Sequence, residues 1–503
     1  MIYYSTTLLM VLAFLIFTLL VGLYATKKAI TFREYAVGNK SFHTSKLVVT
    51  TLATIFGGAS MMVWTTCFYD WGIYSMTFSI ILMFRYSMCS LLGLRMGPFM
   101  QHLSIAETIG SIYGKYPRLI VACISICFMI SMVSLEINVM SSIIAMCIDS
   151  IDPRIFTMLA TLILIIYATF GGIRAVTVTD VWQFVTFTIM IPLLMKFVFI
   201  KTDKSLLEAF LFLKKHHEFS LSNFFKVDSN TQKSGLLLEF LSTVPFISPT
   251  VIHRAYMSAG PMQIRKVFLC VSLIIPVIII FLLIISLFVF VGAPNLPVQA
   301  VWPYILADMP PVYKGCFMIS VLGMAMSTAD SNLHTASIMF SHDVVQSIRG
   351  IKRDPYIDQL RIAKLAGLFT GLLSMIVTLY YLDPLDLAEY VIEPITFAMP
   401  IIVLPPFILA LFGFRGTTCT ALVGMATAIV MATGIVVTYG WYDWVKDIMV
   451  LSGILANGLA MMAAHYCLKQ PKGQGWVALD PQQKRIQQLI RAFKRYKKRL
   501  DLK

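Results

Sequence analysis

The sequence has few charged residues and no clustered cysteines. Of its 503 residues, 13% are charged and 58% are hydrophobic, whereas ordinary soluble domains have about 25% charged residues. A chain of this composition has too few polar side chains to cover its own surface. The nine cysteines are scattered and none belongs to a CxxC pair, so the sequence suggests neither disulfides nor a cysteine-bound metal.

Apolar runs recur along almost the whole chain. Each can cross the hydrocarbon core of a bilayer, which takes about 20 helical residues. The runs are continuous rather than alternating, which excludes a membrane barrel. We predict an all-α integral membrane protein whose thirteen transmembrane helices lie at 7-25, 45-68, 72-97, 117-146, 154-173, 178-200, 235-258, 265-292, 313-342, 362-382, 386-412, 418-439 and 445-468.

The first apolar run does not resemble a signal peptide. No basic residue precedes it, and Lys27 and Lys28 follow it, so we expect a retained span with its N-terminus outside. With that orientation, 29 of the 40 lysines and arginines fall on the side of the C-terminus. Because cytoplasmic loops hold the positive excess, we expect a cytoplasmic C-terminus in the cell (inner or plasma) membrane.

The net charge of +15 comes largely from the C-terminal tail. Between Lys484 and Arg499, basic residues alternate with apolar ones at helical spacing. This pattern is typical of a helix lying on an anionic membrane surface, so the lipid bilayer is an expected partner. A solvated, disordered tail is the alternative. Neither interpretation requires a nucleic-acid partner.

No segment outside the predicted spans is long enough for a soluble catalytic domain. The longest are 201-234, which is expected to carry a surface helix, and the tail at 469-503. No pattern of metal ligands and no pair of nucleophile and base stands out. We therefore expect a protein that is not an enzyme, has no cofactor and functions inside the helical bundle.

Two of the predicted spans contain helix-breaking residues at their centres. The second has Gly57 and Gly58, and the seventh has Pro245 and Pro249. Unwound backbone at membrane depth is tolerated where it lines a cavity, and its free carbonyls and amides can bind ions and solutes. Because the two spans are five helices apart, the breaks point to an inverted-repeat transporter with a site near the midplane.

The ninth predicted span has one polar face. Its hydroxyl and imidazole side chains recur at steps of three or four residues, so this face should look into the bundle; they belong to Ser320, Ser327, Ser331, His334, Ser337 and Ser341. Adjacent hydroxyls together with carbonyls of an unwound helix would suit a sodium ion. Alternatively, the hydroxyls bond to carbonyls one turn earlier in their own helix.

Ionisable residues inside spans are costly and usually face a partner or a water-filled path. Seven occur here: Arg85, Glu136, Asp180, Lys196, Glu239, Asp330 and Glu393. Two interpretations of Arg85 and Glu136 remain open. They form a structural pair, or one of them contacts the solute.

Several motifs resemble those of the sodium:solute symporter family, which contains proline, pantothenate, sugar and sialic-acid transporters. The similarity runs in the same order from about residue 15 to 440. The matching segments are 22-24, 34-41, 103-107 with 113-114, 170-176, 179-183, 253-254, 327-331 and Asp343. The most recognisable is the central one, Phe170-Gly-Gly-Ile-Arg174-Ala-Val followed by Thr179-Asp180.

The resemblance implies a leucine-transporter-type fold with two inverted five-helix repeats. One helix precedes the repeats and two follow them, in agreement with the count of spans made above. The chain then divides into a first helix and loop, a first repeat, an outer loop, a second repeat, two further helices and the tail, at 1-44, 45-200, 201-234, 235-412, 413-468 and 469-503.

The resemblance also implies a sodium ion between the second and ninth spans. The matching ligands are the hydroxyls of Ser327 and Thr328 and the backbone carbonyls near Met324, Thr54 and Gly57. Asp180 matches an acidic residue implicated in sodium release toward the cytoplasm. These matches favour sodium binding over bonding of the two hydroxyls within their own helix.

The resemblance says less about the solute. The family binds it beside the broken helices, so the expected neighbours are Gly58, Ser60, Glu136, Phe246 and Thr250. Many relatives have a neutral residue where Glu136 falls, so the carboxylate either selects a cationic or amine-bearing solute or pairs with Arg85.

Together these features predict a sodium-coupled importer of a small organic solute. One alternative is a proton-coupled porter that uses Asp180, Glu136 or Asp330. A solute sensor of the same fold is the less favoured alternative.

Overall fold

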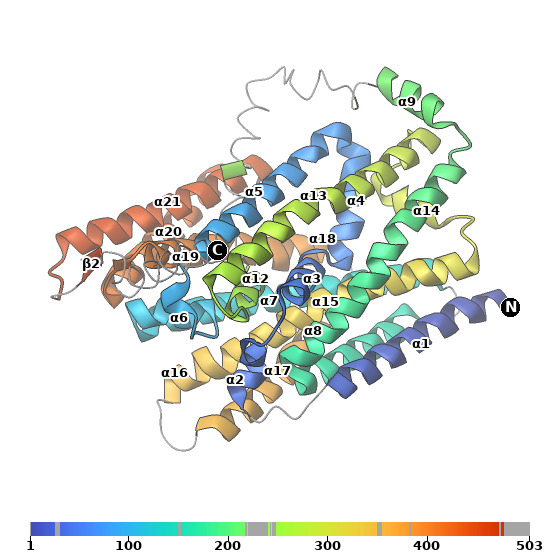
Figure 1. Cartoon of the computed structure of the whole chain (residues 1–503). Helices are drawn as coiled ribbons and strands as arrows, with labels where there is room; N and C mark the ends of the chain where they lie inside the picture. Colours follow the sequence, from blue (N-terminus) through green and yellow to red (C-terminus); the bar gives the residue numbers. More distant parts are fainter. Residues whose placement is uncertain are drawn as a thin grey trace, which may run out of the picture.

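The chain forms a bundle of long helices (Figure 1). Its computed structural model describes residues 2–25, 31–148, 152–216, 219, 240–241, 243, 248–349, 355–381, 384–471 and 474–476. Among these residues, the only strands are β1 (Phe414–Arg415) and β2 (Gly475–Trp476), which pair antiparallel. The predicted tail helix between Lys484 and Arg499 lies outside the described residues.

The long helices of the first part of the chain follow one another with short connections. They are α1 (Ile2–Ala25), α3 (Thr44–Ile55), α4 (Gly58–Trp71), α5 (Met76–Gly93), α7 (Lys115–Cys147) and α8 (Pro153–Lys201). Short helices connect them: α2 (Phe32–Val37), η1 (Gly38–Lys40), η2 (Gly72–Ser75), η3 (Gly97–Phe99) and α6 (Ile105–Tyr113). The expected surface helix is α9 (Leu206–Lys215), which begins with a capping box formed by Ser205 and Glu208.

The second part of the chain also consists of long helices joined by short elements. Its long helices are α13 (Pro261–Gly292), α15 (Pro311–Met339), α17 (Pro355–Tyr380), α19 (Glu393–Leu411), α20 (Thr418–Tyr439) and α21 (Asp443–Cys467). Its short elements are α12 (Pro249–Tyr256), η5 (Val298–Ala300), α14 (Val301–Leu306), the π-helical η6 (Phe340–Val345), α16 (Gln346–Arg349), α18 (Pro384–Leu387) and the π-helical η7 (Ala388–Ile392).

Ten helices of the described residues are long and apolar enough to cross a membrane, or eleven with the bent pair of α3 and α4. The prediction was thirteen. Two observations explain the difference between eleven and thirteen. The predicted spans 154-173 and 178-200 both lie in α8, and much of 235-258 falls outside the described residues. The count of thirteen therefore stays a prediction.

Helix α8 changes direction at Gly172. Its 49 residues would be about 70 Å long as one straight helix, which exceeds twice the thickness of the hydrocarbon core. Gly172 has φ 63° and ψ −167°, so the two halves are separate helical segments. Tyr35 packs into this turn, where its hydroxyl donates to the carbonyl of Thr169 at 3.0 Å.

Helix α15 lies at the centre of the bundle. It packs against α1, α7, α8 and α17, and every residue from Phe317 to Met339 is buried except half-buried Ile319. The polar face predicted for this segment therefore lies inside the protein. By contrast, α20 and α21 lie at one side of the bundle and pack mainly against each other and α19 (Figure 1).

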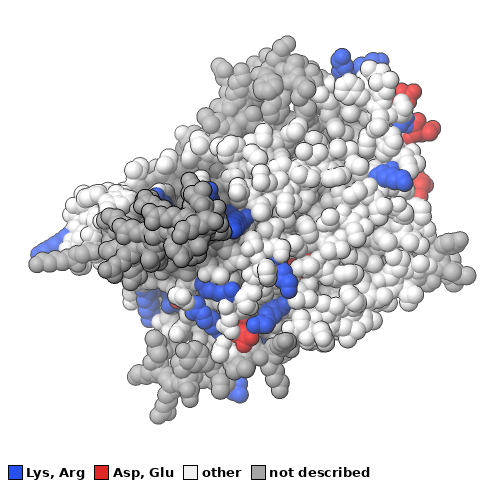
Figure 2. Space-filling model, viewed as in Figure 1, with Lys and Arg blue, Asp and Glu red and all other residues white. Residues whose placement is uncertain are grey.

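Charged side chains gather at two ends of the molecule. Figure 2 shows mainly Lys and Arg near α2, both signs of charge near α9, and a broad uncharged band between them. Many large apolar side chains of the long helices are exposed, such as Leu9, Ile189, Leu273 and Val430. Such a band is what a protein surrounded by lipid requires.

We expect Gly172→Ala to destabilise the protein. A Cβ at Gly172 would come within 2.7 Å of the Tyr35 ring, and its φ of +63° disfavours any residue with a side chain. Together these effects should cost about 2 kcal/mol or more, which a melting temperature in detergent would reveal. The matched control is Gly434→Ala in α20, where a Cβ meets nothing within 4 Å. Equal melting temperatures for the two variants would show that the turn at Gly172 does not require a glycine.

Candidate functional site

The second predicted span is broken at the centre of the bundle. Helix α3 ends at Ile55 and α4 begins at Gly58, and the two are bent by 61°. Phe56 and Gly57 adopt non-helical conformations between them, with ψ 77° and 171°. The break predicted at Gly57 and Gly58 is therefore present. The second predicted break runs from Pro245 to Pro249. Residues 245–247 lie outside the described residues, and Ser248 caps the helix that begins at Pro249.

The side chain of Thr328 on α15 reaches the end of α3. Its hydroxyl lies 3.3 Å from the carbonyl oxygen of Ala53 and 3.4 Å from that of Thr54. The Gly57 carbonyl instead accepts from the amide of Met61 at 3.2 Å, within the first turn of α4. Of the carbonyls expected near Thr54 and Gly57, those beside the Thr328 hydroxyl belong to Ala53 and Thr54.

Ser327 points to a different partner from its neighbour. Its hydroxyl donates to Asp180 Oδ1 at 2.5 Å, and Thr50 of α3 donates to Oδ2 of the same carboxylate. Neither Ser327 nor Thr328 bonds to a carbonyl of its own helix, whereas Ser337 does so at 2.7 Å. The alternative of bonding within the helix thus applies to Ser337 but not to Ser327 or Thr328. Met324, one turn before Thr328, is buried.

Arg254 joins four parts of the bundle. Its Nη2 lies 3.3 Å from Asp180 Oδ2 on α8 and donates to Thr54 Oγ1 on α3 at 2.9 Å and to Ser331 Oγ on α15. Arg254 lies on α12 and is buried, since only 1% of its side chain is exposed.

Asp330 adds a second buried carboxylate to this cluster. It accepts from Tyr167 at 2.8 Å and from Ser331 at 3.3 Å, and Thr179 lies 3.4 Å away. Asp180 and Asp330 thus lie close to a single guanidinium group. Because unpaired charges are costly away from water, the hydroxyl groups around both carboxylates are needed to hold them.

The described residues among the expected solute neighbours lie around the same break. Gly58 packs so closely on α15 that a Cβ would lie 3.0 Å from Ala325 Cβ. Ser60 donates to the carbonyl of Ile55 at 3.3 Å. Thr250 donates to Asn332 at 2.6 Å, and Asn332 donates to the carbonyl of Thr328 at 2.8 Å. Phe246 and the ionisable Glu239 lie outside the described residues.

Glu136 and Arg85 have different partners. Glu136 on α7 accepts from the backbone amide of Ala59, at the start of α4, at 3.2 Å. Arg85 on α5 donates to the carbonyl of Thr243 at 3.0 Å. The structure therefore gives no support to the interpretation that these two residues form a structural pair.

Comparisons with known proteins agree with this architecture. The model of the sodium:solute symporter family matches residues 35–428. The chain belongs to the sodium:solute symporter family. This symporter is an integral membrane transport protein rather than an enzyme. A search of curated proteins gave no match.

Solved structures show the same fold at low sequence identity. A Na⁺-coupled sialic acid symporter in a substrate-bound, outward-open state has a TM-score of 0.80 at 19% identity, covering 95% of this chain and 99% of its own. A nucleobase-cation-symport-1 family transporter with bromovinylhydantoin bound has a TM-score of 0.56 at 11% identity, covering 86% and 94%. MhsT in complex with L-phenylalanine has a TM-score of 0.51 at 14% identity, covering 83% and 97%. The leucine-transporter-type architecture is confirmed at this level.

A second polar cluster ties together the ends of three elements of the symporter. Asp343 of η6 accepts from Ser104 before α6 at 2.6 Å and from Arg118 of α7 at 2.8 Å. Glu107 lies 3.0 Å from His342 and accepts from the amide of Leu103 at 2.7 Å. Burial opposes ionisation of Glu107, but His342 and this amide outweigh it and lower its pKa to about 2. The motifs at 103-107 and Asp343 thus serve one contact.

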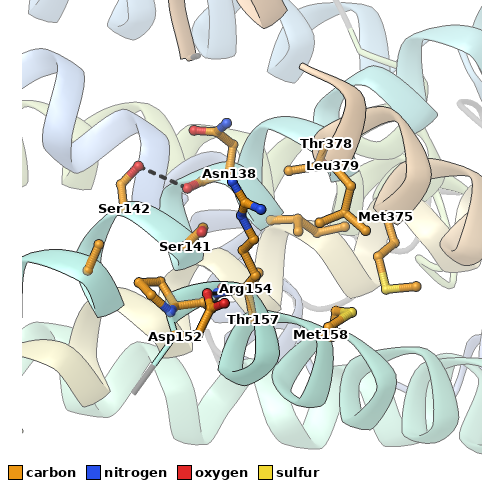
Figure 3. A pocket seen from close by; sticks show the side chains of 13 residues that line it. Asn138, Ser141, Ser142, Asp152, Arg154, Thr157, Met158, Met375, Thr378 and Leu379 are labelled. Atoms are coloured by element: carbon orange, nitrogen blue, oxygen red, sulfur yellow. Dashed lines mark hydrogen bonds between the residues drawn. The ribbon is translucent and has the colours of Figure 1, made fainter. Parts of the chain in front are cut away.

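Two cavities of the symporter lie away from the helix break. One of about 280 Å³ lies between α7, the start of α8 and α17, and Figure 3 shows Arg154 beside Asn138 and Ser141 there. Another, of about 360 Å³, lies beside Lys46 and Arg174. None of the predicted sodium or solute residues lines either cavity, so these cavities do not define the transport site.

Replacing Arg254 should destabilise the symporter unless its carboxylate partner is also neutralised. Arg254→Met leaves the buried Asp180 without its cation, which should cost about 3–5 kcal/mol. The double variant Asp180→Asn with Arg254→Met removes both charges and should recover part of that loss. Melting temperatures of the two single variants and the double variant test this coupling. Strictly additive effects would contradict it.

Proposed function

We propose that this protein is a sodium-coupled symporter that imports a small organic solute. The observation that carries the proposal is the convergence of the Thr328 hydroxyl on the carbonyls of Ala53 and Thr54 at a helix break. Together with Ser327 next to it, this arrangement gathers neutral oxygens from two helices. Such a set suits a small monovalent cation better than a divalent ion, which prefers carboxylates.

The helix break explains why these carbonyls have no backbone partner. In a continuous helix, the carbonyls of Ala53 and Thr54 would accept from the amides of Gly57 and Gly58. Because α3 ends at Ile55, its last carbonyls lack those partners. A sodium ion would satisfy them and join α3 to α15 at the same time. Met324 would contribute its carbonyl, as the family resemblance implies.

The proposed ion site keeps Asp180 within reach. Ser327 donates a hydrogen bond to Asp180, so the lone pairs of the same hydroxyl oxygen stay available to sodium. Asp180 would attract the ion as it leaves the first site toward the cytoplasm. Arg254 would hold the carboxylate in place and limit how strongly it binds the ion. Solute would bind next to this site, near Gly58, Ser60, Glu136, Phe246 and Thr250.

Alternating access would then use the two halves of the fold. We propose thirteen spans with an outer N-terminus, a cytoplasmic C-terminus, and inverted repeats at 45-200 and 235-412. We also propose that the rest of the chain divides at 1-44, 201-234, 413-468 and 469-503, and that the basic tail at 469-503 lies on the membrane surface. Each sodium ion moving inward gains about 2.3 kcal/mol per 100 mV of membrane potential. Rocking of one bundle against the other would release ion and solute inside.

One observation favours a second candidate, a proton-coupled porter of the same fold. Asp180 and Asp330 are both buried near the single guanidinium group of Arg254. This group can neutralise one carboxylate, so the other can bind and release a proton. Replacing sodium by choline at fixed pH separates the two candidates. Loss of uptake in choline supports sodium coupling, whereas unchanged uptake supports the proton.

Removing either hydroxyl at the ion site should weaken sodium coupling. We expect Ser327→Ala and Thr328→Ala to raise the sodium concentration for half-maximal uptake by about tenfold, since each removes one ligand. Uptake measured against sodium concentration at constant ionic strength tests this. The screen for a transported solute would cover amino acids, vitamins, sugars and organic acids.

Ser337→Ala is the matched control for this experiment. Ser337 is also a buried hydroxyl of α15, but it donates to the carbonyl of His334 in its own helix. Its sodium dependence should stay that of the unaltered protein. Unchanged sodium dependence in Ser327→Ala and Thr328→Ala variants that reach the membrane would rule out this ion site.

A further inference from the structure

Glu136 is a buried carboxylate that directly contacts the helix break. Only 3% of its side chain is exposed, and it comes from α7 rather than from either half of the broken span. One of its oxygens, Oε2, accepts from the amide of Ala59 at 3.2 Å. The carboxylate thus occupies the N-terminus of α4, where backbone amides are otherwise free.

The second carboxylate oxygen of Glu136 and the hydroxyl of Thr328 both point at the backbone of Gly57. A Cβ added to Gly57 would lie 2.0 Å from Glu136 Oε1 and 2.8 Å from Thr328 Oγ1. Only a glycine fits between them. Oxygens from α7 and α15 therefore converge on the unwound backbone, beside the carbonyls of Ala53 and Thr54 that the Thr328 hydroxyl also contacts.

The Glu136 carboxyl group has no cationic partner among the described side chains. None of their ion pairs includes it. The N-terminus of α4 compensates part of the charge, because a helix end carries about half a positive charge. A buried carboxylate in this position is therefore suited to receive a further positive group.

The position of Glu136 also restricts which solutes fit. In related transporters, the N-terminus of a half-helix can receive an anionic group of the solute. Here a carboxylate of the protein already occupies that N-terminus. A solute carboxylate would lie against a like charge, so binding of an anionic group at α4 is disfavoured.

We propose that Glu136 binds a positive group during transport, either a second sodium ion or a protonated amine of the solute. The proposal rests on the sodium-coupled transport argued above. It deepens that function by assigning a charged ligand to the site. Both sources use the same chemistry, a monovalent cation held by the carboxylate between α4 and α15.

Glu136→Gln separates the charge from the hydrogen bond. Glutamine keeps an oxygen that can accept from the Ala59 amide, but it carries no charge. Glu136→Ala removes both. The matched control is Glu393→Gln in α19, which removes a carboxylate that pairs with Lys446 far along the chain from the break.

Two measurements distinguish the sources of the positive group. Equilibrium binding of radioactive sodium to purified protein, without solute, tests the ion. Uptake of amine-bearing amino acids and polyamines, compared with uptake of sugars, tests the amine. In Glu136→Gln we expect either the sodium affinity or the uptake of amine-bearing compounds to fall by about tenfold or more, with Glu393→Gln unchanged.

Some outcomes would overturn this inference. If Glu136→Gln binds sodium and takes up amines like the unaltered protein, while Glu136→Ala only melts at a lower temperature, Glu136 is merely a cap of α4. A different measurement shows whether the proposed sodium coupling itself is wrong. If the unaltered protein takes up solute equally well in choline, sodium coupling is wrong, and the amine comparison still tests Glu136.

Discussion

The break between α3 and α4 is the constraint on which the rest of the structure depends. A transmembrane helix normally satisfies its own backbone groups, so two unwound residues inside the bundle need partners from elsewhere. Here α15 supplies the Thr328 hydroxyl to the end of α3, and α7 supplies the Glu136 carboxylate to the start of α4. The polar partners of the two halves of the broken span thus come from different helices. Whatever binds at the break connects those helices.

The polar cluster beside the break links the elements that would have to move. Asp180 of α8 contacts side chains from α3, α12 and α15, and all four residues involved are buried. Hydrogen bonds to buried charges are strong and have specific directions. Moving α3 or α12 away from α8 and α15 would break several of them at once. A cation that binds at the break can compensate for that loss, which gives a physical link between ion binding and the shape of the bundle.

Much of the site could be predicted from the sequence. Paired glycines indicate the break, and the spacing of hydroxyls indicates the buried face of α15. The resemblance to the family implies that this face lies next to the break. The Thr328 hydroxyl lies beside the carbonyl of Ala53 rather than that of Gly57. This follows from a local rule, since the carbonyls in the last turn of a helix that ends at Ile55 have no backbone partner. The contacts of Arg254 and Glu136 could not be predicted, because they depend on distances between helices far apart in the chain. Arg254 follows His253 in a family motif, and that was its only signal in the sequence.

Hydrogen–deuterium exchange at the break tests the central claim most directly. If sodium joins α3 to α15, peptides covering residues 50 to 60 should exchange more slowly in sodium than in choline at equal ionic strength. The surface helix α9 should exchange equally in both salts. Equal exchange at the break in both salts, in protein that takes up its solute, would contradict the account.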